Sequence, residues 1–137
     1  MYQNILIAVE ESDYSFRASQ EVFNFLGEET KVTIIHAIDP NRVDGELLPS
    51  VFNEMKYKQF EERYAQIKEI YDDKDVNYDL LILKGNLVKT IVDEANSGKY
   101  DALIIGARGK KGLLSLDLGD VSDKLLKEVT IPIILVK

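Results

Sequence analysis

The apolar positions divide the chain into five short hydrophobic runs separated by longer amphipathic stretches. The runs are continuous rather than alternating, which is typical of strands buried on both faces of a parallel sheet. We therefore expect five strands that belong to one parallel sheet. The runs occupy Ile5–Val9, Val32–Ile38, Leu80–Leu83, Ala102–Ile105 and Ile131–Val136.

The stretches between these runs carry apolar residues at helical spacing and predict four helices. Gly27 is expected to end the first helix, and the second is expected to start after Pro49-Ser50. We interpret the aromatic residues of the second stripe as core rather than as a cofactor-binding set. The stripes are Phe16, Val22, Phe25 and Leu26; Phe52, Met55, Phe60, Tyr64, Ile67 and Tyr71; Leu87, Ile91, Val92 and Ala95; and Val121, Leu125, Leu126 and Val129.

The strict alternation of strands and helices predicts an α/β fold, with helices on both faces of an open parallel sheet. A chain of 137 residues fits one domain that spans residues 1–137. The longest irregular segment, Asp39–Pro49, follows the second strand, where either a binding loop or a plain connector would lie.

Composition narrows the possible functions. Without cysteine the chain has no disulfide and no thiolate metal site. A net charge of −7 argues against nucleic acid and anionic membranes as main partners. No apolar stretch reaches the roughly 20 residues of a membrane span, and the first residues do not resemble a signal peptide. We expect a cytoplasmic protein.

The candidate site lies where ligands bind in open α/β sheets, beyond the carboxyl ends of the strands. Glu10–Ser12 follow the first strand, Ala37–Asp39 end the second, and the glycine-rich stretch Gly106–Gly112 follows the fourth and runs on to Gly119. Glycines allow backbone N–H groups to approach a phosphate, and the next helix adds a positive N-terminus. The basic residues Arg108, Lys110 and Lys111 fit such a phosphate site, or else a solvated loop.

The glycine spacing Gly106-x2-Gly109-x9-Gly119 resembles the ATP-binding motif of the universal stress protein family. The stretches ILIAVEES and IIHAID resemble the first two strands of that family. The likeness covers the whole chain and is closest over Gly85–Lys137, so the chain is identified as a member.

This resemblance implies the strand order 3-2-1-4-5 and a homodimer. It also implies a stress-response regulator that binds ATP or a related adenine nucleotide. Because the sequence supplies no clearly positioned catalytic base, we expect that the protein is not an enzyme. The adenine would lie near Ala8, Val9 and Glu10, and would contact the backbone of Ala37. The ribose and phosphates would lie on Ile105, Gly106, Arg108, Gly109, Gly119, Asp120, Val121 and Ser122.

Three residues depart from the family pattern. Glu10 replaces the usual Asp, Glu11 the usual Gly, and Asp120 the usual Ser or Thr. A carboxylate cannot donate a hydrogen bond to phosphate, although Mg2+ or Mn2+ could bridge the two. The alternative function is therefore a protein with a degenerate pocket that acts through protein–protein interaction, and a weak ATPase ranks third.

The other candidate residues have ordinary explanations. His36 is the only histidine and is expected to pack or to form a local hydrogen bond, and Ser12 is expected to cap a helix. The acidic cluster Glu10, Glu11 and Asp13 is read as a solvated turn rather than a metal site, and Asp72–Asp75 as a solvated helix end.

The last strand, Ile131–Val136, is expected to lie at a sheet edge, where Pro132 is tolerated. An apolar edge can pair with a second copy, so we predict a homodimer through this strand.

Overall fold

The sheet has the predicted order. The computed structural model describes residues 2–10, 12–41, 49–107 and 120–137. Five strands lie in the order β3-β2-β1-β4-β5, and every neighbouring pair is parallel, which confirms the predicted fold. The elements are β1 (Asn4–Ala8), α1 (Asp13–Glu21), β2 (Lys31–Ile38), α2 (Pro49–Asp73), β3 (Asn77–Lys84), α3 (Leu87–Ala95), β4 (Ala102–Gly106), α4 (Asp120–Glu128) and β5 (Ile133–Val136).

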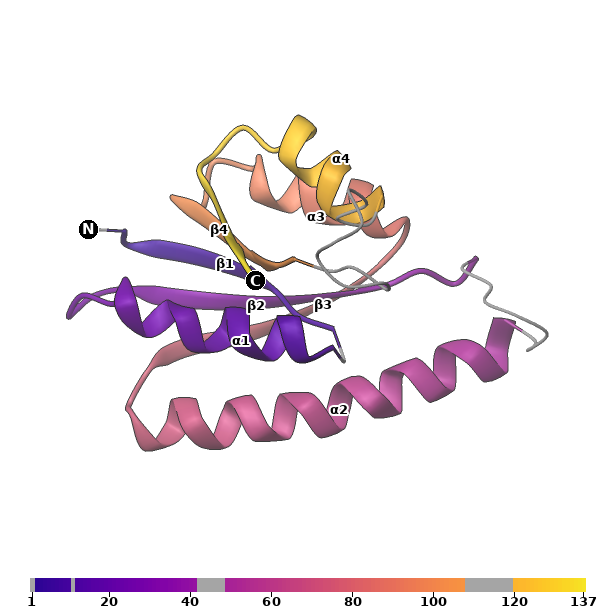
Figure 1. Ribbon diagram of the computed structural model, residues 1–137, viewed down its shortest axis with the longest axis horizontal. Helices are drawn as coiled ribbons and strands as arrows, with labels where there is room; N and C mark the ends of the chain where they lie inside the picture. Colours follow the sequence, from indigo (N-terminus) through magenta and orange to yellow (C-terminus); the bar gives the residue numbers. More distant parts are fainter. Residues whose placement is uncertain (1, 11, 42–48, 108–119) are drawn as a thin grey trace.

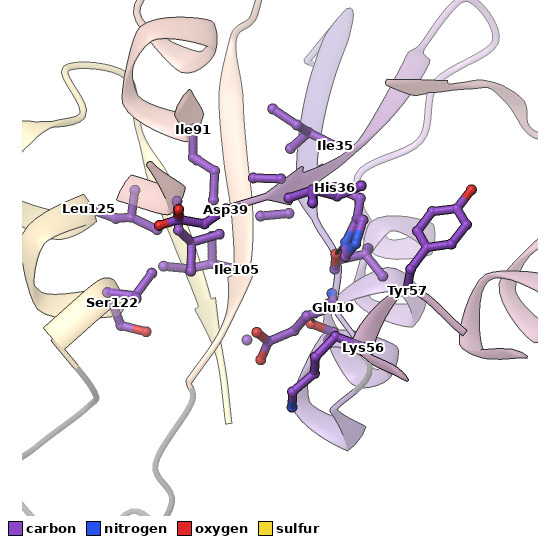
Figure 2. Close-up of a pocket in the computed structure, with 18 of the residues that line it drawn as sticks. Glu10, Ile35, His36, Asp39, Lys56, Tyr57, Ile91, Ile105, Ser122 and Leu125 are labelled. Carbon is purple, nitrogen blue, oxygen red and sulfur yellow. Dashed lines mark hydrogen bonds between the residues drawn. The ribbon is translucent and has the colours of Figure 1, made fainter. Parts of the chain in front are cut away.

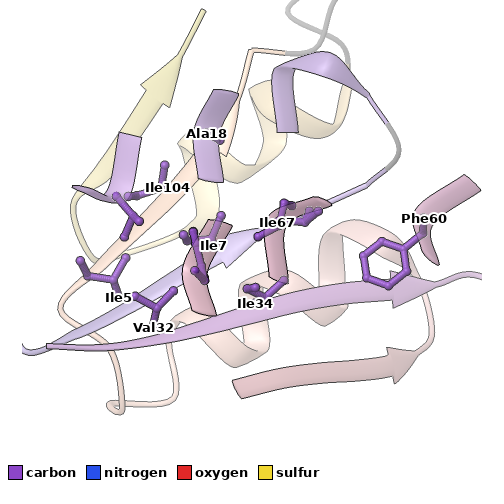
Figure 3. Close-up of a cluster of buried hydrophobic side chains, with 11 residues drawn as sticks. Ile5, Ile7, Ala18, Val32, Ile34, Phe60, Ile67 and Ile104 are labelled. Carbon is purple, nitrogen blue, oxygen red and sulfur yellow. The ribbon is translucent and has the colours of Figure 1, made fainter. Parts of the chain in front are cut away.

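Helices cover both faces of the sheet. Helices α1 and α2 lie on one face and α3 and α4 on the other (Figure 1). The central strand β1 supplies both cores, because Ile5 and Ile7 point to α1 and α2 whereas Leu6 points to α3 and α4. All three side chains are fully buried, and each such burial contributes about 1.5–3 kcal/mol. Figure 3 shows Ile5 and Ile7 packed with residues from α1, α2, β2 and β4.

The first helix is shorter than its apolar stripe predicted. It ends at Glu21, and a 3-10 turn follows over Val22–Asn24, closed by the bond from the Phe25 N–H to the Val22 carbonyl at 2.9 Å. Phe25 therefore lies beyond the helix, and Gly27 does not end it. Phe25 nevertheless packs against the core, which explains why the hydrophobic pattern alone gave the wrong boundary.

The edge strands differ most from prediction. Strand β3 spans Asn77–Lys84, longer than the apolar run, and its residues alternate between exposed and half-buried. Strand β5 begins at Ile133, so Pro132 precedes it, and the Pro132 carbonyl accepts from the Leu103 N–H at 2.9 Å. Edge strands are shielded less than central ones, so their sequences carry a weaker apolar signal.

Two stripe residues face solvent rather than the core. Met55 on α2 is 40% exposed, and Leu126 on α4 is 41% exposed. The remaining members of the α2 stripe are buried or pack against the core. None of the helices within the described ranges is long and apolar enough to cross a bilayer.

Candidate functional site

A pocket lies at the carboxyl ends of β1, β2 and β4, where the strand order reverses. Eight predicted site residues line it: Ala8, Val9, Glu10, Ala37, Ile105, Gly106, Val121 and Ser122. Arg108, Gly109 and Gly119 lie outside the described residues. Asp120 is the first residue of α4, and its side chain also lies outside the description. The structure thus brings together residues that are more than 100 positions apart in the sequence.

The end of β1 is held by a chain of hydrogen bonds. The Val9 N–H donates to the Ile35 carbonyl at 3.0 Å, which is the last ladder bond between β1 and β2. The Glu10 N–H then turns away and donates to Ser15 Oγ at 2.9 Å. Ser12 Oγ in turn accepts from the Ser15 N–H at 3.2 Å, which confirms Ser12 as the cap of α1. Strand β1 therefore leaves the sheet at Glu10.

Because β1 ends early, β2 extends past it. In a parallel ladder, the N–H and carbonyl of one residue point to the same neighbouring strand, and every second residue repeats this direction. Ile35 points toward β1, since its carbonyl accepts from Val9, so Ala37 points the same way. In a continued ladder the Ala37 N–H would donate to the Val9 carbonyl, but that carbonyl lies 2.9 Å from His36 Nδ1. Ala37 lines the pocket on the edge of β2 that faces β1.

His36 holds the β1 end from the α2 side. The residue is 8% exposed, and its Nδ1 lies 2.9 Å from the Val9 carbonyl. A carbonyl only accepts, so Nδ1 carries the proton. The ring also stacks on Phe60 of α2, with centroids 3.7 Å apart and an interplanar angle of 9°. The predicted packing and hydrogen-bonding role of His36 is confirmed, and the residue also lines the pocket.

The pocket has two unlike walls. On the side of α3 and α4 the lining is mainly apolar, and Figure 2 shows Ile91, Ile105 and Leu125 together there. On the side of α2 the lining is mainly polar and includes Lys56 and Tyr57. Such a combination suits a ligand with a flat apolar body and polar edges.

The sequence pattern does not predict the polar wall. Phe52, Asn53, Lys56 and Tyr57 of α2 line the pocket, although the aromatic stripe to which Phe52 belongs was interpreted as core alone. Phe52 is only 2% exposed, so it serves the core and the pocket together. One signal was available: Asp39, which also lines the pocket, begins the segment that leads from β2 into the first turns of α2.

Gly106 has a packing reason to be glycine. A Cβ at this position would lie 2.6 Å from both the carbonyl carbon and the oxygen of Tyr14, which are backbone atoms of α1. Real Cβ atoms do not approach backbone so closely, so the end of β4 and the start of α1 pack in direct contact. This requirement is independent of any phosphate.

The acidic residues near Ser12 do not gather into a metal site in the described part of the chain. The Asp13 carboxylate pairs with Arg63 of α2 at 2.8 Å, whereas Glu10 lines the pocket, and Glu11 lies outside the description. Among the described residues, no group of three or more His, Asp or Glu could hold a metal ion.

Two other predicted segments can be placed. Asp39 Oδ1 accepts from the Asn41 N–H at 2.9 Å, whereas residues 42–48 of the expected loop lie outside the description. Asp72 lies exposed in the last turn of α2 and accepts a bond of 2.6 Å from the Tyr78 hydroxyl. Burial, together with this bond, raises the pKa of the Tyr78 phenol.

Comparisons with known proteins agree on one family. The family model described as the universal stress protein family matches residues 1–137. The chain is 27% identical to universal stress protein MJ0531 of Methanocaldococcus jannaschii, over all of this chain and 83% of that protein.

Solved structures share the fold. Universal stress protein UspA from Lactobacillus plantarum superposes with a TM-score of 0.82 at 20% identity, covering 99% of this chain and 98% of that one. A family protein from Arabidopsis thaliana with AMP bound superposes with a TM-score of 0.61 at 20% identity, over 98% and 91% of the two chains.

Proposed function

This chain belongs to the universal stress protein family, and from that premise we propose that it binds an adenine nucleotide in the pocket at the carboxyl ends of the strands. ATP is the nucleotide that we expect it to bind. The role of the protein is that of a stress-response regulator rather than of an enzyme. The cysteine-free composition fits the reducing cytoplasm, where we place it.

The observation that carries this proposal is the direction of Ala37 in β2. Adenine carries an amino donor at N6 beside a ring acceptor at N1, so it complements one carbonyl and one N–H. Guanine in the same orientation would place its O6 acceptor against the carbonyl and its N1–H donor against the N–H, so neither hydrogen bond could form. Ala37 lines the pocket where β2 extends past β1, and we expect its N–H and carbonyl to meet this pair of adenine groups.

The walls of the pocket support the same ligand. Ile91, Ile105 and Leu125 supply apolar surface for the flat base. Val121 and Ser122 lie in the first turn of α4, whose N-terminus favours negative charge, as the phosphates require. The relative from Arabidopsis thaliana has AMP bound, which makes an adenine nucleotide the natural first ligand to test.

We further propose that the protein is a homodimer through β5. This strand lies at one edge of the sheet, and all four of its residues are half-buried. The ladder bonds from Leu103 to Pro132 and from Ala107 to Val136 direct alternate residues toward β4, so the backbone of Ile133 and Leu135 faces outward. Antiparallel pairing of two copies would satisfy these groups.

The dimer is tested by replacing Leu135 with proline, which removes one outward donor and leaves the bonds to β4 in place. We expect Leu135→Pro to run at 15.6 kDa in light scattering and the unchanged chain to run at twice that mass. A monomeric unchanged chain at micromolar concentration would contradict the dimer.

Nucleotide binding is tested by denaturing the purified protein, identifying any nucleotide released, and titrating the emptied protein with ATP and GTP in a calorimeter. We expect ATP to bind at least tenfold more tightly than GTP. Equal affinity would contradict the role of Ala37, and binding of neither would contradict the proposal.

Asp120 favours a second candidate function, in which the pocket is degenerate and the protein acts through partner proteins. Asp120 stands where the family motif has a hydroxyl, at the first residue of α4. Absence of nucleotide binding with Mg2+, with Mn2+ and with chelator, by a protein that is folded and dimeric, would favour this alternative. Binding that requires the metal would instead favour a cation bridge to the phosphates.

A further inference from the structure

The wall that α2 contributes to the pocket carries a single positive charge. Among the described residues that line the pocket, Lys56 is the one lysine or arginine. The two carboxylates in the same lining are Glu10 and Asp39, and the whole chain has a net charge of −7. An anionic ligand therefore meets more negative than positive charge on the described part of these walls, where Lys56 is the one cation that attracts it.

Lys56 is held at the pocket by its own helix. It lies one turn after Phe52, and its ammonium stands over the Phe52 ring, 5.6 Å from the centroid. Phe52 is 2% exposed and lines the pocket too, so the lysine stem runs along a fixed surface. Figure 2 shows Lys56 on the same side as Glu10 and across the pocket from Ser122 of α4.

We propose that Lys56 is a specificity-determining residue that makes the pocket prefer nucleoside phosphates over uncharged nucleosides. This inference rests on the proposed function, because it concerns the same pocket. Ala37 and the apolar wall select the base, and they treat adenosine and ATP alike. Lys56 adds an attraction that exists only when the ligand carries phosphate, and that increases with the charge of the ligand.

The test is calorimetric titration of the purified protein with adenosine, AMP and ATP. Lys56→Met keeps the length of the stem and its contact with Phe52 but removes the charge. We expect Lys56→Met to weaken ATP binding about tenfold, about 1.4 kcal/mol, and AMP binding less, while adenosine binding changes less than about twofold. Lys56→Arg keeps the charge, so it should retain most of the preference for ATP.

Lys58 provides the matched control. It is exposed, lies two residues along α2, and is not part of the pocket lining. Lys58→Met changes the net charge by the same amount, so any general effect of charge on ATP binding appears in both variants. We expect Lys58→Met to bind all three ligands like the unchanged chain.

The possible outcomes separate this inference from the function on which it rests. Equal losses for adenosine and ATP, no loss for either, or equal losses in Lys56→Met and Lys58→Met would each overturn the role of Lys56, while nucleotide binding itself stands. If the unchanged chain binds none of the three ligands, the proposed function fails and the role of Lys56 fails with it.

Discussion

Replacing Gly106 by alanine is expected to destabilise the protein and to weaken ligand binding, through packing rather than through contact with phosphate. The added Cβ would lie 2.6 Å from backbone atoms of Tyr14, so β4 and α1 must separate by several tenths of an ångström. Overpacking of this kind costs about 1–3 kcal/mol. The lower entropy of the unfolded chain offsets about 0.4–1 kcal/mol of that.

The net loss of unfolding free energy should therefore be about 1–2 kcal/mol, which for a chain of this length lowers Tm by roughly 3–10 °C. Urea denaturation with an unchanged m-value is the suitable assay. The start of α1 also carries Ser15, which holds the Glu10 N–H at the pocket, so a displaced α1 should weaken ATP binding as well.

Gly98→Ala is the control for that second effect. Gly98 has φ +90°, which strains any L side chain, but nothing lies within 4 Å of a Cβ there, and it does not line the pocket. Gly98→Ala should lower the unfolding free energy by about 1–2 kcal/mol and leave ATP affinity unchanged. If Gly106→Ala retains full stability but loses ATP binding, the packing explanation is wrong and Gly106 serves the phosphate directly.

Three further predictions concern single side chains. Ser12→Ala removes the cap of α1 and should lower the unfolding free energy by about 1 kcal/mol in urea denaturation, whereas Ser12→Asp should retain it. The Asp101 carboxylate accepts from the N–H groups of Asn4 and Gln3 at 2.8 Å, and these bonds lower its pKa. The stabilisation that they provide is therefore present above the unfolded pKa of about 4 and is lost as the pH falls through the folded pKa. Asp101→Asn should make the stability depend less on pH between about 5 and 2, and an unaltered pH profile of the Tm would contradict this. Asp120→Ser restores the usual motif, and calorimetric titration without metal should show ATP binding strengthened by about tenfold or more. Unchanged ATP affinity with and without Mg2+ would place Asp120 away from the phosphates.

The central part of the fold could be predicted because its sequence pattern is strong. Strands β1 and β4 are buried in continuous apolar runs, and both were located to within one residue. The extent of β3 could not be predicted, since an edge strand admits exposed residues such as Asn77, Asp79 and Lys84. The end of α1 was missed for another reason: Phe25 packs against the core from outside the helix.

The site was predictable on one side only. The residues at the ends of β1, β2 and β4 follow from the general rule for open α/β sheets, and they do line the pocket. The α2 wall depends on where a long helix crosses the sheet edge, which no local pattern encodes. Lys56 and Tyr57 consequently had no signal of their own in the sequence, and the packing reason for Gly106 was equally invisible.

The most direct test of nucleotide binding in this pocket is the backbone amide spectrum of the 15N-labelled protein during titration with ATP. We expect the Ala37 amide to shift downfield as it begins to donate to the base, and the Ser122 and Gly106 amides to move at the same ligand concentrations. Saturable shifts that leave Ala37 unmoved, or no shifts at millimolar ATP with and without Mg2+, would contradict this expectation.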